Sequence, residues 1–252
     1  MNLIVPDWID APKNIGAFCT TRAGGISPAP YDDGAGSGGL NLGTHVNDLP
    51  QNVQHNRALL RTLLPSEPAW LNQVHGTEVV DAAAVSSVPD ADASFTMQAG
   101  TVCAIQTADC LPVLLCDVAG SMVAAAHAGW RGLASGVLEN TVKKMRGNGA
   151  GEILAWLGPA IGPQRFEVGG DVFQAFVERH PRASEAFAPI SNQPGKYLAD
   201  IYVLARIALT KVRVERVYGG GMCTVSEQSR FFSYRRDQVT GRMASLIWIK
   251  QS

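Results

Sequence analysis

The chain has 252 residues, of which 46% are apolar and 17% are charged, and its formal net charge is −1. This composition is typical of a soluble globular protein, and a charge near zero excludes a global attraction to nucleic acid or to an anionic membrane. The apolar stretches are interrupted well before the ~18 residues that a membrane span requires. The N-terminal stretch lacks the basic start and apolar run of a signal peptide, so we expect a cytoplasmic protein. From the charge and the short apolar stretches we expect it to bind neither nucleic acid nor membrane.

The first part of the chain contains a long irregular segment. Residues 15–22 (IGAFCTTR) predict a strand, and the Gly- and Pro-rich residues 23–43 predict a loop. Loops of this length in compact domains are usually functional or mobile. Apolar residues at helical spacing predict an amphipathic helix over 51–64, which ends before Pro65. Residues 69–82 (AWLNQVHGTEVVDA) predict two short strands around a His-Gly corner.

The middle of the chain is dominated by predicted strands. Residues 101–117 (TVCAIQTADCLPVLLCD) and 121–129 (SMVAAAHAG) are rich in small and β-branched side chains, which favour strands. Residues 132–145 predict a helix whose last turn carries basic side chains, as the helix dipole prefers. Residues 152–161 (EILAWLGPAI) predict a buried strand that ends in a Gly-Pro corner.

The C-terminal part alternates between the two element types. Residues 171–180 and 200–212 predict helices, each with an aspartate as its N-cap and an apolar stripe. Residues 214–225 predict a strand followed by a glycine turn, and residues 230–250 predict a hairpin-like pair of strands. This irregular order of elements predicts a single α+β domain over residues 1–252. We expect a layered α/β sandwich whose mostly antiparallel or mixed sheets are covered by helices.

The cysteines indicate a reducing environment. There are five of them, an odd number, and the sequence contains neither a CxxC pair nor a dense disulfide framework. Cys103 and Cys116 lie inside predicted strands without a histidine partner, so we interpret them as packing residues.

One cysteine and one histidine bracket the two central strands. If these strands form a hairpin centred between Val118 and Ala119, Cys110 stands directly opposite His127 on one face of the sheet, with Cβ atoms about 5 Å apart. Such a pair can supply two ligands of a tetrahedral zinc. The alternative interpretation is that the cysteine is a small apolar side chain and the histidine a satisfied polar group.

Two neighbouring motifs strengthen the metal hypothesis. In AGWRGLASG, Arg131 lies at the predicted start of a helix, where it could complete an anion pocket; the competing interpretation is a surface arginine in a Gly-rich turn. In NQVHG, His75 stands at a corner where a glycine permits sharp backbone geometry. On sequence alone His75 competes with His45 and His55 as a third ligand.

Seven motifs in sequence order resemble one known family. The motifs NQVHG, TADCLPVLLCD, AAAHAGWRG, GPAIG, FEVG, CT and FFSYRRD…TGRMA are similar to those of the multicopper-polyphenol-oxidase-like, or laccase-domain, proteins, which include purine nucleoside phosphorylases of the zinc-dependent type. The resemblance runs from residue 20 to the C-terminus. It implies a compact α/β domain that phosphorolyses adenosine, inosine and methylthioadenosine and also deaminates adenosine.

The resemblance also implies roles for individual residues. The metal ligands fall on His75, Cys110 and His127, which leave a fourth position of the metal open. From the chemistry of phosphorolysis, Arg131 becomes the candidate for the attacking phosphate. Asp109, beside Cys110, becomes the candidate for proton transfer or for orienting a ligand, although a plain turn or strand-end role is as consistent. Four further residues match positions that line the family's pocket or a second basic motif: Arg22, Asn41, Arg235 and Arg236.

Three rival functions follow from the same residues. A copper-dependent polyphenol oxidase would need more histidines for a trinuclear cluster than the five in the chain, although copper could occupy a zinc site. A metal-free hydrolase of amides or peptidoglycan precursors would use Cys110 as nucleophile and His127 as base. A metal-binding module without catalysis is the third. The sequence does not specify the oligomeric state.

Overall fold

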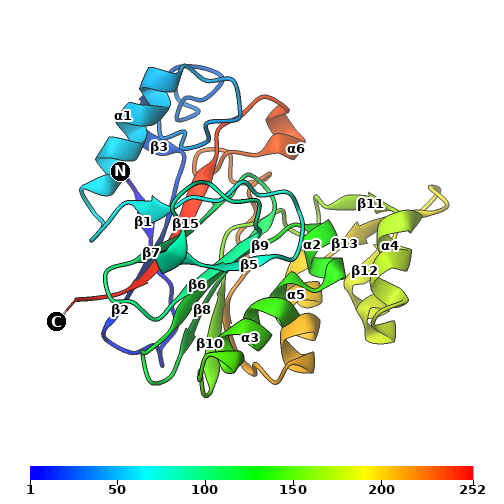
Figure 1. Cartoon of the computed structure of the whole chain (residues 1–252). Helices are drawn as coiled ribbons and strands as arrows, with labels where there is room; N and C mark the ends of the chain where they lie inside the picture. Colours follow the sequence, from blue (N-terminus) through cyan, green and yellow to red (C-terminus); the bar gives the residue numbers. More distant parts are fainter. Residues whose placement is uncertain (252) are drawn as a thin grey trace.

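The computed structural model describes residues 1–251 as two large β-sheets that pack face to face, with helices on the outside (Figure 1). The first sheet has the order β1-β2-β15-β7-β4. Its strands span Leu3–Ile4, Ile15–Thr20, Met243–Ile249, Val102–Thr107 and Pro68–Ala69. The C-terminal strand β15 lies at the centre of this sheet, antiparallel to both β2 and β7, so the two ends of the chain are joined in one layer.

The second sheet is mixed and has the order β14-β10-β8-β9-β6-β5. Its strands span Arg216–Gly219, Ile153–Leu157, Leu111–Asp117, Val123–Ala128, Ala93–Thr96 and Val79–Asp81. The three central pairings are antiparallel, whereas β10 with β14 and β5 with β6 are parallel. The predicted class, mostly antiparallel or mixed sheets covered by helices, is confirmed.

The remaining elements surround this sandwich. A small third sheet, in the order β11-β13-β12, is formed by Glu167–Gly169, Lys196–Ala199 and Phe187–Pro189, and β3 spans Ala23–Ser27. The α-helices α1 to α6 span Pro50–Arg61, Trp130–Ser135, Val137–Gly147, Gly170–Val177, Ile201–Lys211 and Tyr234–Asp237. Short 3₁₀ turns lie at Ala82–Ala84 and Pro181–Ala186. Within residues 1–251, no helix combines the length and apolar character needed to cross a membrane.

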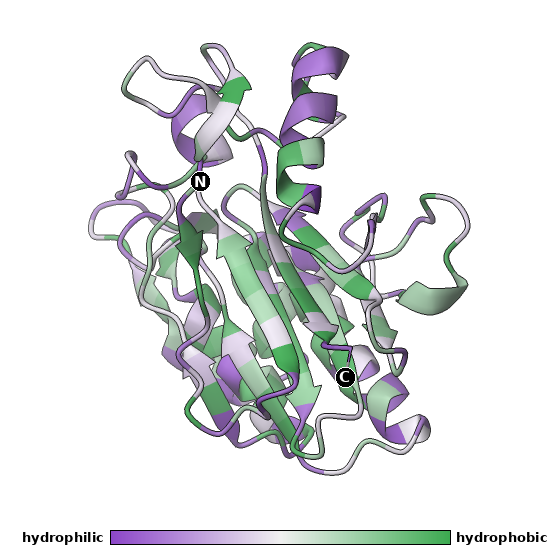
Figure 2. Cartoon of the chain, turned by 90° about the vertical axis from the view of Figure 1, so that its left-hand side faces the viewer, coloured by the Kyte–Doolittle hydropathy of each residue, from purple (hydrophilic) through white to green (hydrophobic). Residues whose placement is uncertain are grey.

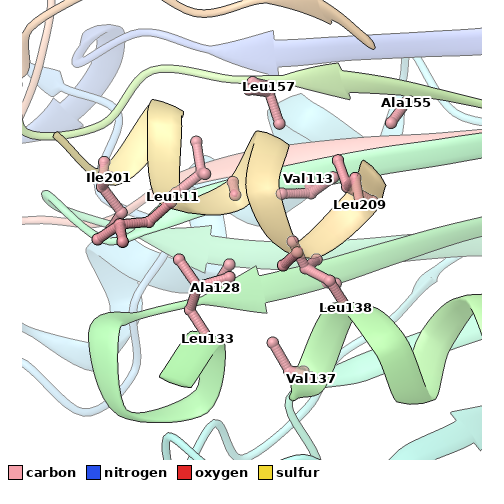
Figure 3. Close-up of a cluster of buried hydrophobic side chains, with 14 of the residues drawn as sticks. Leu111, Val113, Ala128, Leu133, Val137, Leu138, Ala155, Leu157, Ile201 and Leu209 are labelled. Atoms are coloured by element: carbon pink, nitrogen blue, oxygen red, sulfur yellow. The ribbon is translucent and has the colours of Figure 1, made fainter. Parts of the chain in front are cut away.

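Strand alternation distributes the core into layers. On β8, Leu111 and Val113 pack against the helices (Figure 3), and Leu115 belongs to the same cluster. Leu114 and Cys116 face the five-stranded sheet instead. Both faces of β8 are therefore buried, which explains its continuous apolar sequence. The strands of the sandwich are predominantly hydrophobic in Figure 2. Cys103 and Cys116 are fully buried, as expected for packing residues.

Most predicted elements are present, with several local differences. Strand β3, Ala23–Ser27, lies within the predicted loop over 23–43. The helix predicted over 132–145 is divided into α2 and α3 by Gly136, which has a φ of 101°. Asp200 caps α5 as predicted, but α4 begins at Gly170 after an N-cap at Gly169, so the aspartate cap predicted there is wrong. The predicted C-terminal hairpin is also wrong: β15 pairs with β2 and β7, and the residues before it form α6 and loops.

The central hairpin differs from its predicted register by a wider turn. Leu111 pairs with Ala128 and Pro112 with His127, so Cys110 does not stand directly opposite His127. The reason is Asp117, whose carboxylate accepts hydrogen bonds from the backbone N–H groups of Ser121 and Met122 and holds a four-residue loop, 118–121. A shift of two residues leaves every side chain on its original face, so the predicted proximity survives the error in register.

Candidate metal centre

The site lies at one end of the sandwich, where four strands begin or end. Thr107 at the end of β7 pairs with Met243 at the start of β15, and Leu111 at the start of β8 pairs with Ala128 at the end of β9. The segments that leave these strands therefore lie together at one end of the two packed sheets. This end holds the sulfur and imidazole ligands predicted from the sequence.

His75, Cys110 and His127 form one cluster. One donor atom from each side chain lies within 4.8 Å of the other two, and Cys110 Sγ is 3.7 Å from His75 Nε2. The two imidazole rings are 4.7 Å apart at an angle of 71°. His127 is buried, Cys110 is half-buried and His75 is exposed, so the cluster is open to solvent on the His75 side.

The backbone around the cluster is unusual at the positions that bring the ligands together. His75 has a φ of 61° and Asp109, directly before Cys110, has a φ of 97°, both in the left-handed region. Gly129 leaves room for the cluster: a Cβ there would lie 2.7 Å from His75 Cδ2 and 3.1 Å from Cys110 Sγ. The residue that follows the His127 strand therefore has to be glycine for these side chains to keep their places.

A single buried carboxylate, Asp92, fixes both histidines. Its Oδ1 accepts hydrogen bonds from the backbone N–H of His75 at 2.9 Å and is 2.7 Å from His127 Nδ1. Its Oδ2 accepts from the backbone N–H groups of Val74 at 3.2 Å and Gly76 at 2.6 Å. Asp92 thus shapes the His75 loop and leaves Nε2 of His127 for the cluster, the usual arrangement behind a metal-bound histidine.

The cluster favours a charged sulfur. Burial raises the pKa of the Cys110 thiol, but the His127 charge and the hydrogen bonds from both histidines outweigh this effect and lower the pKa below its ordinary value. Burial likewise lowers the pKa of His127, whereas the Cys110 thiolate and Asp92 raise it to a larger extent. The site therefore favours a Cys110 thiolate beside either a protonated His127 or a metal ion, and thiolate is the form of cysteine that binds metal.

The cluster opens into a cavity of about 420 Å³. Besides the three ligands, its walls include His45, Gln73, Gln106, Tyr234 and Arg242. Gln73 connects two walls, because its side-chain amide exchanges two hydrogen bonds of 2.8 Å with the backbone of Gln106 at the end of β7. A cavity of this size is typical of a small-molecule site, and its walls carry many polar side chains that could fix the orientation of a bound molecule.

Six of the predicted site residues are not among those that line the cavity, and three of these six are Arg131, Arg22 and Asn41. Arg131 is exposed, and its guanidinium stacks on the Trp130 ring at 4.4 Å. Arg22 is buried and donates to the carbonyls of Asp32 and Gln228, which fixes the Gly-rich loop. Asn41 is buried, and its Oδ1 accepts the backbone N–H of Arg242 at 2.9 Å. Of the described residues, those lining the cavity include none of Arg22, Asn41 and Arg131.

The other predicted residues belong to a hydrogen-bond network behind the cluster. Asp109 accepts from Thr224 Oγ1 and from the backbone N–H of Arg235, both at 2.6 Å. The side chain of Arg235 donates to the Glu167 carbonyl. Arg236 is the more buried arginine of the pair, and its guanidinium donates to the backbone carbonyls of residues 224, 225 and 231. In this geometry these residues position the segment that carries Tyr234.

Sequence reasoning missed three residues of the site: Asp92, Tyr234 and Arg242. Tyr234 and Arg242 lie in the SYRRD and TGRMA motifs, but the interpretation placed weight on the arginines at 235 and 236 instead. Asp92 is one of two aspartates in DADASFT, residues 90–96, directly before a short strand, and this pattern is too common to single out a site residue. Each of the three is brought to the cluster by contacts between distant segments.

The donor set fits a divalent metal ion. Two imidazoles and one thiolate are a combination used by catalytic zinc, and three protein donors leave one coordination position open. The space that Gly129 leaves and the anchoring of both histidines by Asp92 support the same interpretation.

Comparison with known proteins places this geometry in a family. A family model described as multi-copper polyphenol oxidoreductase laccase matches residues 16–250. The chain belongs to this family. A purine nucleoside phosphorylase of Pseudomonas aeruginosa is 54% identical over 98% of both chains, and purine nucleoside phosphorylase YfiH of Escherichia coli is 53% identical over 98% of both. A crystal structure of a Neisseria meningitidis protein is similar with a TM-score of 0.91, 50% identity and full coverage of both chains. These similarities confirm the predicted family and fold.

Proposed function

We propose that this protein is a zinc-dependent purine nucleoside phosphorylase that cleaves adenosine, inosine and methylthioadenosine with phosphate and also deaminates adenosine. The observation that carries the proposal is the His75–Cys110–His127 cluster at the wall of a nucleoside-sized cavity that also contains Arg242. Curated relatives with 47–54% identity bear the name purine nucleoside phosphorylase, which supports the same reaction class.

The three clustered side chains would hold the metal. When bound, the ion supplies Lewis-acid chemistry, which polarises an oxygen or activates a water. Asp92 keeps the His127 ring in the orientation that directs Nε2 at the cluster, and the lowered pKa of the Cys110 thiol supplies the thiolate near neutral pH. The five histidines of the whole chain are too few for a trinuclear copper cluster, which argues against polyphenol oxidase chemistry.

Arg242 is the residue we assign to the phosphate. Its backbone N–H is held by Asn41, and its guanidinium donates to the carbonyls of Thr240 and Gly241 at 3.1 Å each, so the side chain is fixed at the cavity wall. Partial burial lowers the pKa of Arg242 from its ordinary value, but Cys110 and Asp109 act in the opposite direction. A guanidinium removed from bulk water binds phosphate through paired, charge-assisted hydrogen bonds.

The proton for the departing base has a less direct source. Asp109 was predicted for proton transfer, but both of its carboxylate oxygens are occupied, by Thr224 and by the backbone of Arg235. The geometry therefore favours the positioning role that was predicted as its alternative.

One specific observation favours the hydrolase as a second candidate. Cys110, His127 and Asp92 are arranged like a nucleophile, a base and the carboxylate that orients the base. The paired shifts in the pKa values of Cys110 and His127 are also those of a reactive thiol. An amide or a peptidoglycan precursor would be the substrate class in that case.

Product analysis with and without metal separates the two. Purified protein is stripped with a chelator, reloaded with zinc, and incubated with adenosine in the presence or absence of phosphate. We expect phosphate-dependent release of adenine and phosphate-independent formation of inosine, both lost on stripping and restored by zinc. His75→Ala should abolish both activities. Activity on amides that survives chelation and is lost only on alkylation would support the hydrolase instead.

A further inference from the structure

Tyr234 is a large aromatic side chain that lines the cavity yet remains exposed. Its side chain is 53% exposed, whereas the residue before it, Ser233, is fully buried. An exposed aromatic ring at the wall of a cavity is apolar surface that a bound molecule can cover.

The backbone that carries this ring is held from both sides. Tyr234 is the first residue of α6, and the Ser233 hydroxyl accepts the N–H of Arg236 at 3.2 Å. Asp109 accepts the N–H of Arg235 at 2.6 Å, immediately after the tyrosine. Because Asp109 directly precedes Cys110, one short segment carries a metal-ligand candidate and fixes the helix of Tyr234. The backbone that carries the ring therefore has a defined place relative to the cluster.

We propose that the ring of Tyr234 is the surface on which the purine base of the substrate stacks. This inference rests on the proposed function and assigns the wall of the cavity that recognises the base. Adenosine, inosine and methylthioadenosine differ in the substituent at C6 or at C5′ but share the purine ring. Stacking on an aromatic side chain depends on the π-face and tolerates different substituents, so one residue can serve all three nucleosides.

The proposal predicts a ranking among substitutions. Tyr234→Phe keeps the ring and should leave the KM values for adenosine and inosine within about twofold of the wild type. Tyr234→Leu keeps apolar bulk but removes the ring, and should raise both KM values by roughly 5- to 100-fold. The control is Tyr218→Leu, on the edge strand β14 and hydrogen-bonded to Asp10, which should leave both KM values unchanged.

Equilibrium binding keeps the test independent of turnover. Binding of inosine, which the proposed deamination does not consume, is titrated calorimetrically without phosphate for the wild type and the three variants, and thermal melting confirms that each is folded. Binding without phosphorolysis in the wild type would refute the proposed function, yet a loss of affinity confined to Tyr234→Leu would still support stacking. Equal affinity of Tyr234→Leu and wild type would refute stacking, as would equal losses in Tyr234→Phe and Tyr234→Leu, which would assign the effect to the hydroxyl. Absence of nucleoside binding to the wild type would overturn both proposals.

Discussion

Replacing Asp92 by asparagine should lower the affinity for zinc, beyond any loss of thermal stability that the same change causes at a buried carboxylate elsewhere. The carboxylate is fully buried and satisfies three backbone N–H groups and His127 Nδ1. Each carboxylate oxygen of Asp92 contacts two of these four groups. An asparagine places an NH₂ group where one oxygen was, so at least one backbone N–H then faces another donor. Loss of such support behind metal ligands typically costs 10- to 100-fold in metal affinity, and we expect a decrease in this range.

The hairpin itself offers a matched control. Asp117 is a second buried carboxylate, at the opposite end of β8 and β9, and it accepts hydrogen bonds from two backbone N–H groups and the Ser121 hydroxyl. Asp117→Asn should lower the thermal stability of the metal-free protein, as Asp92→Asn does, because each leaves buried donors unpaired. It should not change zinc affinity.

Zinc affinity is measured by competition with a chromophoric chelator, and stability by thermal melting of the metal-free proteins. We expect a loss of zinc affinity in Asp92→Asn alone, with a comparable loss of thermal stability in both variants. Equal zinc affinity in Asp92→Asn and the wild type would refute it, and so would an equal decrease in both variants.

The other expectations concern the space, charge and reactivity of the site. Gly129→Ala should disrupt metal binding because its Cβ would lie 2.7 Å from the His75 ring, whereas Gly147→Ala, with nothing within 4 Å, should bind zinc normally in the same competition assay. Arg242→Met should raise the KM for phosphate at least about tenfold with a smaller effect on the KM for adenosine; a similar rise in both would contradict its assignment to phosphate. Burial raises the pKa values of the thiols at 19, 103 and 116 to about 12, whereas hydrogen bonds lower that of Cys223 despite burial. Near pH 7.5, alkylation followed by mass spectrometry should therefore label only Cys110 and Cys223 in the native metal-free protein, and zinc should protect Cys110; labelling of the three buried thiols at a similar rate would contradict this.

The alternation of side chains along the strands predicted which face carries the site, although the predicted pairing register was wrong. Cys110 and His127 were placed on one face of a hairpin, and this survived because the error in the turn was two residues, the period of a strand. The turn itself depends on the Asp117 side chain, which forms hydrogen bonds that a two-residue turn would not allow. His75 lies in a loop, where periodicity gives no information. The residues made it one of three candidates, with His45 and His55, and the family motif selected it.

Long-range pairing explains what the sequence could not provide. Arg242 reaches the cavity because β15 inserts between β2 and β7, a pairing across most of the chain that local patterns do not encode. Asp92 reaches both histidines from the start of β6, and Tyr234 is placed by the contact of Asp109 with α6. The arginines predicted for substrate were recognisable as basic motifs, but two of the four, Arg22 and Arg236, are held by backbone carbonyls inside the protein.

Elemental analysis of the purified protein tests the central claim most directly. If His75, Cys110 and His127 hold a catalytic zinc, the wild type should contain about one zinc per chain, and the folded Cys110→Ser variant should contain almost none. A wild type that takes up no zinc when reloaded, or equal zinc content in the wild type and Cys110→Ser, would contradict the claim.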